Sequence, residues 1–199
     1  GVGFEALAWG RHVDDHRDAW EIVRRADHPN VGLILDSFHT LGRGIAANSI
    51  RRIPGDRIFF VQLADAPRIN MDLLYWSRHF RNMPGEGDLA VADFLSAVID
   101  TGYDGPLSLE IFNDQFRGGL PRGVARDGHR ALTALIDDVR RATGRPVAAT
   151  PLPATQPILG TAYLEVAARD ADAAVVDRAL RSLGFDRIGR HADQAAELW

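Results

Sequence analysis

Four polar side chains stand at or near the carboxyl ends of four short apolar runs. They are Glu5, Asp36, Gln62 and Glu110. If the runs are parallel strands of a β/α barrel, their carboxyl ends meet at one mouth of the fold, where active sites of such barrels are built. Three carboxylates and an amide oxygen that meet there repel one another unless a cation lies between them. An all-oxygen set suits Mg²⁺ or Mn²⁺, and Co²⁺ is a third candidate.

Each of these residues also has an ordinary structural explanation. An acid just past a strand often caps the helix that follows, and for any one residue taken alone this explanation is as good as metal binding. The amide of Gln62 can simply satisfy a backbone group. Because all four residues fall at successive strand ends, we favour a shared metal site over four separate caps.

A histidine and a group of possible anion-binding residues accompany the four. His39 lies three residues beyond Asp36, so it places an imidazole beside the metal as a general base or acid. The alternative is a histidine that only packs the loop. After the third run, Arg78 and Arg81, with Ser77, offer bidentate bonds to a substrate carboxylate. Ordinary surface arginines are the competing explanation for this pair.

The composition excludes several kinds of chemistry. The chain has no Cys and no Lys, so its 23 basic residues are all Arg. Thiolate catalysis, Cys-ligated zinc, Schiff-base catalysis and a phosphate-binding P-loop lysine are therefore excluded. The net charge of -4 and the scattered arginines argue against a nucleic-acid partner, and no apolar run is long enough to span a membrane. We expect three further histidines to be solvent-exposed: His12, His16 and His28.

Strand and helix patterns alternate along the first 141 residues. The four apolar runs cover residues 2–7, 31–35, 58–63 and 107–111. Short, nearly continuous runs of this kind are typical of strands buried on both faces of a parallel sheet. Helical periodicity follows over residues 19–26, 91–99 and 132–139. Four strand-then-helix units predict an α/β fold, either a barrel or a doubly wound sheet.

The remainder of the chain has a different organisation. Residues 142–157 hold four of the ten prolines and no periodicity, which predicts an extended linker. A second unit, 158–199, then begins with an expected strand over 163–167, a helix over about 175–183 and a short strand near Ile188. The chain lacks an initiator Met and a recognisable stop, so we interpret it as an internal piece of a longer protein.

Several of these segments resemble a known family. The segments FEALAWGRHV, LILDSFHTLGRG, FFVQLADAP, YWSRHFRNMPGEGDL and GYDGPLSLEIFND are similar to those of bacterial 3-dehydroshikimate dehydratases. These belong to the xylose isomerase-like, or sugar phosphate isomerase/epimerase, TIM-barrel superfamily. The match is to the fused form, whose C-terminal part resembles 4-hydroxyphenylpyruvate dioxygenase. The resemblance covers roughly residues 1–141 for the barrel and, more weakly, 158–199 for the second domain.

The resemblance implies a fold, a reaction and a set of roles. The first domain would be the C-terminal half of a TIM barrel, strands five to eight. Residues 158–199 would begin a βαβ dioxygenase-like (vicinal oxygen chelate) domain, although no iron ligands are recognisable there. The metal ligands fall on Glu5, Asp36, Gln62 and Glu110, the catalytic histidine on His39, and the substrate contacts on Ser77 and Arg81. The reaction is the metal-dependent loss of water from 3-dehydroshikimate to give protocatechuate, with an arginine on the substrate carboxylate.

Two other functions remain open from the sequence. A sugar or keto-acid isomerase or epimerase can use the same barrel, because fold does not fix function. A catalytically inert fragment is the non-enzymatic alternative, since four strands of eight leave two open edges. We therefore expect these 199 residues alone to be inactive unless a second copy completes the barrel. A cytoplasmic location and a small-molecule substrate are expected, and a homo-oligomer is compatible with the sequence.

Overall fold

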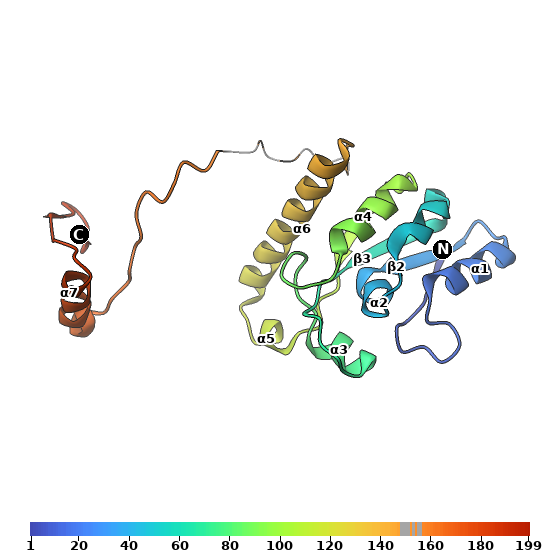
Figure 1. Cartoon of the computed structure of the whole chain (residues 1–199), viewed down its shortest axis with the longest axis horizontal. Coiled ribbons are helices and arrows are strands. Elements are labelled where there is room, and N and C mark those ends of the chain that lie inside the picture. The colour runs from blue at the N-terminus through green and yellow to red at the C-terminus, as the bar shows by residue number, and fades with distance from the viewer. Residues whose placement is uncertain (148–151, 153, 155–156) are drawn as a thin grey trace. The chain divides into compact units, whose positions relative to one another are not determined.

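The structure is a computed structural model that describes residues 1–147, 152, 154 and 157–199. It contains two compact units, Gly1–Pro153 and Ala154–Trp199, whose α-helices are labelled in Figure 1. The two units are described separately.

The first unit is built on a four-stranded, all-parallel sheet. Its strands are β1 (Val2–Glu5), β2 (Val31–Asp36), β3 (Ile58–Leu63) and β4 (Leu107–Leu109), and they pair in the order in which they occur in the chain. The four apolar runs are thus confirmed as strands. Because the strands are parallel and neighbouring in sequence order, their carboxyl ends all lie on the same edge of the sheet.

Helices follow every strand of this sheet. They are α1 (His16–Ala26), α2 (Ser37–Gly42), α3 (Leu73–His79), α4 (Val91–Asp100), α5 (Asp114–Arg117) and α6 (Pro121–Thr143), with 3-10 turns η1 (Ala47–Arg52) and η2 (Gly55–Arg57). The three predicted helical patterns fall inside α1, α4 and α6. Helix α6 begins well before its periodic residues, with Pro121 in the first turn, where a missing N–H costs nothing.

The core lies where the sheet meets these helices. Leu33, Leu63 and Phe94 have no exposed surface, and the core cluster also includes buried residues of α1, α4 and α6. β2 carries buried residues on both of its faces. This burial accounts for the lack of a polar alternation in its sequence.

The boundary between the predicted barrel and linker differs from expectation. Helix α6 continues to Thr143 and ends at Gly144, whose positive φ of 68° suits a glycine. Val147 is only 4% exposed and belongs to the core. The start of the predicted linker is therefore helical or packed, because Val147 has an apolar side chain to bury. Residues 148–151, 153 and 155–156 of that linker lie outside the described residues.

The second unit contains one helix and one small hairpin. A 3-10 turn, η3 (Asp170–Asp172), leads into α7 (Ala173–Ser182), and β5 (Gly189–Arg190) pairs antiparallel with β6 (Glu197–Leu198). The predicted helix and the short strand near Ile188 are both found. The expected strand over 163–167 is wrong: these residues are exposed, and no strand in the described part of the unit pairs with them. Apolar residues form a strand only where a partner strand is available.

Among the described residues, none of the helices combines the length and the apolar character that a bilayer crossing needs.

Candidate metal centre

The four predicted ligands come together at the carboxyl edge of the sheet. Glu5 and Asp36 are the last residues of β1 and β2, and Gln62 is the penultimate residue of β3. Asp36 and Gln62 are direct neighbours in the strand register, and the Glu110 N–H continues the ladder by donating to the Leu63 carbonyl at 3.2 Å. The four side chains therefore lie at one edge of the sheet, as their spacing in the sequence predicted.

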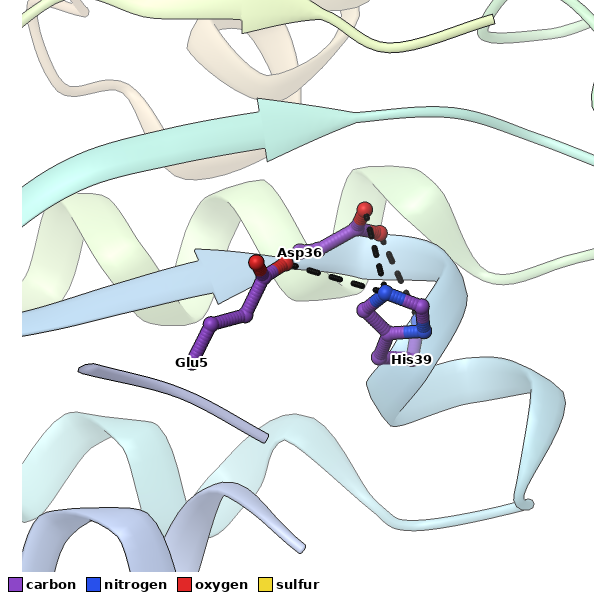
Figure 2. Close-up of side chains that lie close together, drawn as sticks. All are labelled: Glu5, Asp36 and His39. Atoms are coloured by element: carbon purple, nitrogen blue, oxygen red, sulfur yellow. Dashed lines mark hydrogen bonds and ion pairs between the residues drawn. The ribbon is translucent and has the colours of Figure 1, made fainter. Parts of the chain in front are cut away.

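Two of these carboxylates point at His39. Figure 2 shows Glu5, Asp36 and His39 turned toward one another from β1, β2 and α2. One ligand atom from each of the three lies within 4.8 Å of the others. His39 Nε2 is 3.7 Å from Glu5 Oε1 and 3.8 Å from Asp36 Oδ2.

Gln62 and Glu110 form the other part of the cluster. The Gln62 amide donates from Nε2 to Glu110 Oε1 at 2.8 Å. Two oxygens in the cluster, Glu5 Oε1 and Gln62 Oε1, are buried and have no hydrogen-bond partner among the described residues. A buried oxygen without a donor is costly, and a cation satisfies it. The donor set of carboxylate and amide oxygens therefore fits a hard divalent ion.

The electrostatics of the cluster favour a bound cation as well. Burial, reinforced by the negative charges of Asp36 and Glu110, raises the pKa of Glu5 to about 7. Burial and the charge of Asp36 also raise the pKa of Glu110. Burial is the larger cause of both pKa shifts, and the charges of the neighbouring acids add to it. A divalent ion offsets both effects, because it favours the charged carboxylates.

Asp36 also has a structural role. Its Oδ1 accepts from the backbone N–H groups of Phe38 at 2.6 Å and His39 at 3.4 Å, so it caps the first turn of α2. Its Oδ2 faces the cluster, where it accepts from Arg81 Nη1 at 2.7 Å. Capping and ligand binding were alternatives in the sequence, but the two oxygens of one carboxylate allow both.

Arg81 bonds two of the acids of the cluster and is fully buried. Its Nη1 donates to Asp36 Oδ2 at 2.7 Å and to Glu110 Oε2 at 2.9 Å. Its Nη2 and Nε donate to Ser77 Oγ at 2.8 and 3.1 Å. Arg81 thus supplies one positive charge to the acids, and the structure brings both Ser77 and Arg81 to the predicted ligands.

Arg78 is placed differently from its two predicted companions. It is exposed on α3, and its guanidinium lies 5.6 Å from the centre of the Phe112 ring. The Arg81 guanidinium lies 5.4 Å from that ring. Phe112 therefore lies beside both arginines, and only Arg81 contacts the carboxylates.

His39 is held by the loop that follows β1. The Ala8 N–H donates to Nδ1 at 3.2 Å, and the Trp9 ring packs edge-on against the imidazole at 5.0 Å. Arg81 Nη2 also faces the ring, 3.4 Å from Nε2. A neutral imidazole accepts at only one nitrogen. Because the Ala8 N–H can only donate, its bond makes Nδ1 the acceptor, and we infer that the proton is on Nε2, which the Glu5 and Asp36 carboxylates face. Burial, with the charge of Arg81, lowers the pKa of His39 to about 4, so the ring is neutral near pH 7.

One histidine expected at the surface is buried. His12 and His28 are exposed as predicted, but His16 is only 4% exposed. Its Nε2 lies 2.7 Å from Ser49 Oγ, and Thr40 Oγ1 lies 3.4 Å from Nδ1. The charged residues around His16 in the sequence suggested exposure, but the hydroxyl partners come from distant segments.

The chain is similar to known proteins in sequence and in fold. Residues 2–135 match the family model of the xylose isomerase-like TIM barrel. The chain is 47% identical to a 3-dehydroshikimate dehydratase of Pseudomonas putida over 99% of its own length. It is also 47% identical, again over 99% of its length, to the protein of that name from Pseudomonas aeruginosa. It spans 32% of the length of each relative, about a third.

A solved structure gives the same result. A xylose isomerase-like TIM barrel/4-hydroxyphenylpyruvate dioxygenase fusion protein superposes with a TM-score of 0.77 at 47% identity. The superposition covers 98% of this chain and 32% of the solved one. Fold and sequence therefore point to the same family.

Proposed function

The chain belongs to the xylose isomerase-like TIM-barrel family, and we propose that it carries part of a metal-dependent 3-dehydroshikimate dehydratase. The reaction removes one carbon-bound proton and one hydroxyl from 3-dehydroshikimate, giving protocatechuate and water. The 47% identity to the two Pseudomonas dehydratases, over 99% of the chain, is the observation that carries this proposal.

We further propose that the first unit supplies strands five to eight of the barrel and that residues 158–199 begin a dioxygenase-like domain. The four-stranded parallel sheet supports the first statement. The fusion architecture of the matching solved protein supports the second, because this chain aligns with it over nearly its whole length.

The proposed metal ligands are Glu5, Asp36, Gln62 and Glu110. A divalent ion held there, Mg²⁺, Mn²⁺ or Co²⁺, supplies a Lewis acid for the ketone oxygen of the substrate. The unpartnered oxygens of Glu5 and Gln62 support this assignment. Asp36 and Glu110 share the Arg81 guanidinium, which fixes the positions of their carboxylates.

His39 is the proposed catalytic histidine, acting at Nε2. The sequence left His39 as a general base or a general acid. Because Nδ1 accepts the hydrogen bond from the Ala8 N–H, the proton of the neutral ring is on Nε2, and Nε2 then acts as a donor. A neutral imidazole N–H can donate to the substrate hydroxyl that leaves. The carbon-bound proton then needs a base, and the Glu5 carboxylate, 3.7 Å from Nε2, can take it and pass it to the departing hydroxyl, so that water leaves.

Ser77 and Arg81 are the proposed contacts of the substrate carboxylate. They already bond to each other, and Arg81 reaches both the carboxylates and His39. A guanidinium can exchange one carboxylate partner for another without losing its fork geometry. The exposed Arg78, close to the shared Phe112 ring, is proposed as an outer contact.

The test uses the full-length protein stripped of metal with a chelator. Protocatechuate formation from 3-dehydroshikimate is measured by absorbance, before and after adding Mg²⁺, Mn²⁺ or Co²⁺. We expect turnover only with added metal. Turnover that survives the chelator removes the metal from the proposal, and an absence of aromatic product with every ion removes the reaction.

A panel of other substrates distinguishes an isomerase or epimerase from the dehydratase. An isomerase or epimerase on this barrel interconverts sugars or keto acids and releases no aromatic product. A panel of such substrates, analysed by chromatography, should therefore remain unchanged while 3-dehydroshikimate is consumed. Conversion of a panel member with no protocatechuate from 3-dehydroshikimate favours the isomerase.

A further inference from the structure

One residue of the loop after β1 is held at both of its peptide groups by side chains of the α2 segment. The Ala8 N–H donates to His39 Nδ1 at 3.2 Å, and Arg43 Nη1 donates to the Ala8 carbonyl at 2.9 Å. His39 and Arg43 are four residues apart, and Arg43 is the C-cap of α2 in a helical conformation, so both reach the same side. Ala8 itself has no exposed surface.

Arg43 also reaches the far end of this loop. Its Nη2 lies 3.0 Å from Asp14 Oδ2, just before α1 begins. A single guanidinium therefore joins the two ends of the segment that contains Ala8 and Trp9. Trp9 packs on the His39 ring from that segment. The loop has few bonds of its own here, apart from a turn in which the Gly10 N–H donates to the Leu7 carbonyl at 2.7 Å.

The position of Ala8 decides which nitrogen of His39 carries the proton. With the Ala8 N–H on Nδ1, the neutral ring presents an N–H at Nε2 to the carboxylates and the substrate. If the loop shifts, Nδ1 loses its donor, and both the ring orientation and the tautomer become variable. Sub-ångström placement of a catalytic group has large effects on rate.

We propose that Arg43 is a positioning residue for His39: by holding the Ala8 carbonyl and Asp14, it keeps the Ala8 N–H on Nδ1 and so directs the Nε2–H of His39 into the site. The effect of Arg43 on turnover rests on the proposed function. The effect of Arg43 on the His39 tautomer does not rest on it, so turnover and tautomer are measured separately.

The kinetic experiment compares Arg43→Met with a matched control in the full-length, metal-loaded protein. Arg51 is the control, because its side chain is 37% exposed against 32% for Arg43 and it also pairs with one aspartate, Asp100, at 2.7 Å. We expect Arg43→Met to lower kcat roughly 10- to 100-fold, the usual cost of removing an orienting partner, with KM and metal content unchanged. Arg51→Met should keep kcat within about twofold, as expected for an exposed pair.

Two further measurements exclude a general loss of structure. In Arg43→Lys the ammonium can still donate to the Ala8 carbonyl, so this variant should recover part of kcat. In protein labelled with ¹⁵N-histidine, the His39 signals, assigned by their loss in His39→Gln, should show an unprotonated Nδ1 and a protonated Nε2. Arg43→Met should shift this tautomer balance, whereas Arg51→Met should leave it intact.

An unchanged His39 tautomer together with an unchanged kcat in Arg43→Met overturns the proposal. Equal losses of kcat in the Met and Lys variants, with the tautomer unchanged, also overturn it. A wild-type protein that forms no protocatechuate refutes the proposed function instead, while the tautomer measurement still tests Arg43.

Discussion

His39 and His16 are both 4% exposed and lie on neighbouring elements, but their surroundings differ in kind. Burial lowers the pKa of each ring. His16 bonds the hydroxyls of Ser49 and Thr40, and its Nδ1 lies 3.8 Å from the Asp15 carboxylate, which is itself bonded to Arg17. His39 presents Nε2 to two carboxylates at 3.7 and 3.8 Å, at the edge of the sheet where the predicted ligands converge.

The difference shows that burial and a shifted pKa do not by themselves identify a functional histidine. A ring whose nitrogens are both used by neutral protein groups is a packing residue that links segments. A ring with one nitrogen fixed by the backbone and the other facing carboxylate oxygens at the convergent edge of the sheet is placed for chemistry. Variants around His39 should therefore change turnover, whereas variants of His16 should change stability.

The largest effect should come from removing a ligand on the His39 side. Glu110→Ala should abolish Mn²⁺ binding, measured by isothermal titration calorimetry of the full-length protein, and turnover with it, because an oxygen ligand is lost. Asp100→Ala removes a carboxylate of similar exposure, 22% against 30%, that pairs with Arg51 away from the site. That control should bind Mn²⁺ normally. Mn²⁺ binding that survives Glu110→Ala contradicts the ligand assignment.

The second-largest effect should come from His39, with His16 as the control. His39→Gln should lower kcat by roughly 10²- to 10⁴-fold, the usual contribution of a positioned proton-transfer group, while Mn²⁺ binding remains. His16→Gln should leave kcat within a few-fold of wild type, since the ring does not face the cluster. Steady-state kinetics and calorimetry measure both. Loss of Mn²⁺ in His39→Gln would make His39 a ligand rather than a catalytic group.

The third effect concerns stability. A substitution of His16 should lower the free energy of unfolding while it changes the rate of turnover little. Replacing His16 by Ala leaves the Ser49 and Thr40 hydroxyls without their ring partner, which should cost about 1–3 kcal/mol of unfolding free energy. Urea denaturation followed by tryptophan fluorescence measures this. A midpoint identical to that of wild type would show that the buried ring contributes nothing to packing.

The smallest effect is the pH dependence of that stability. Burial lowers the folded-state pKa of His16 below its ordinary value near 6.5, so the unfolded chain binds the proton first as pH falls. The stability that neutral His16 contributes is present above about pH 6.5 and is lost as pH falls below it. His16→Gln should flatten this part of the curve in denaturation series at pH 7.5 and pH 5.5. A slope that is the same in both proteins assigns the dependence to other groups.

Much of this architecture follows from sequence patterns that act locally. Strands buried on both faces need continuous apolar runs, and parallel strands in chain order bring Glu5, Asp36, Gln62 and Glu110 to one edge. The clustering of these four side chains was predictable because it depends only on strand direction and on the residue at each strand end.

Contacts between distant segments were not predictable in this way. The Ala8 hydrogen bond to His39 joins residues 31 apart, and it uses a backbone N–H that any residue at position 8 except proline would supply. Arg81 was expected on the substrate, and no local pattern indicated that its guanidinium bridges Asp36 and Glu110. His16 was misplaced because the charged residues beside it outweighed the distant hydroxyls that cover it.

We propose that Glu5, Asp36, Gln62 and Glu110 hold the metal while His39 stays outside its coordination. Anomalous diffraction from crystals of the full-length protein grown with Mn²⁺ locates the ion relative to these side chains. We expect one anomalous peak within bonding distance of oxygens from these four residues, with His39 Nε2 beyond bonding distance. A peak coordinated by His39 with Glu5 and Asp36, or a peak away from this edge of the sheet, would contradict it.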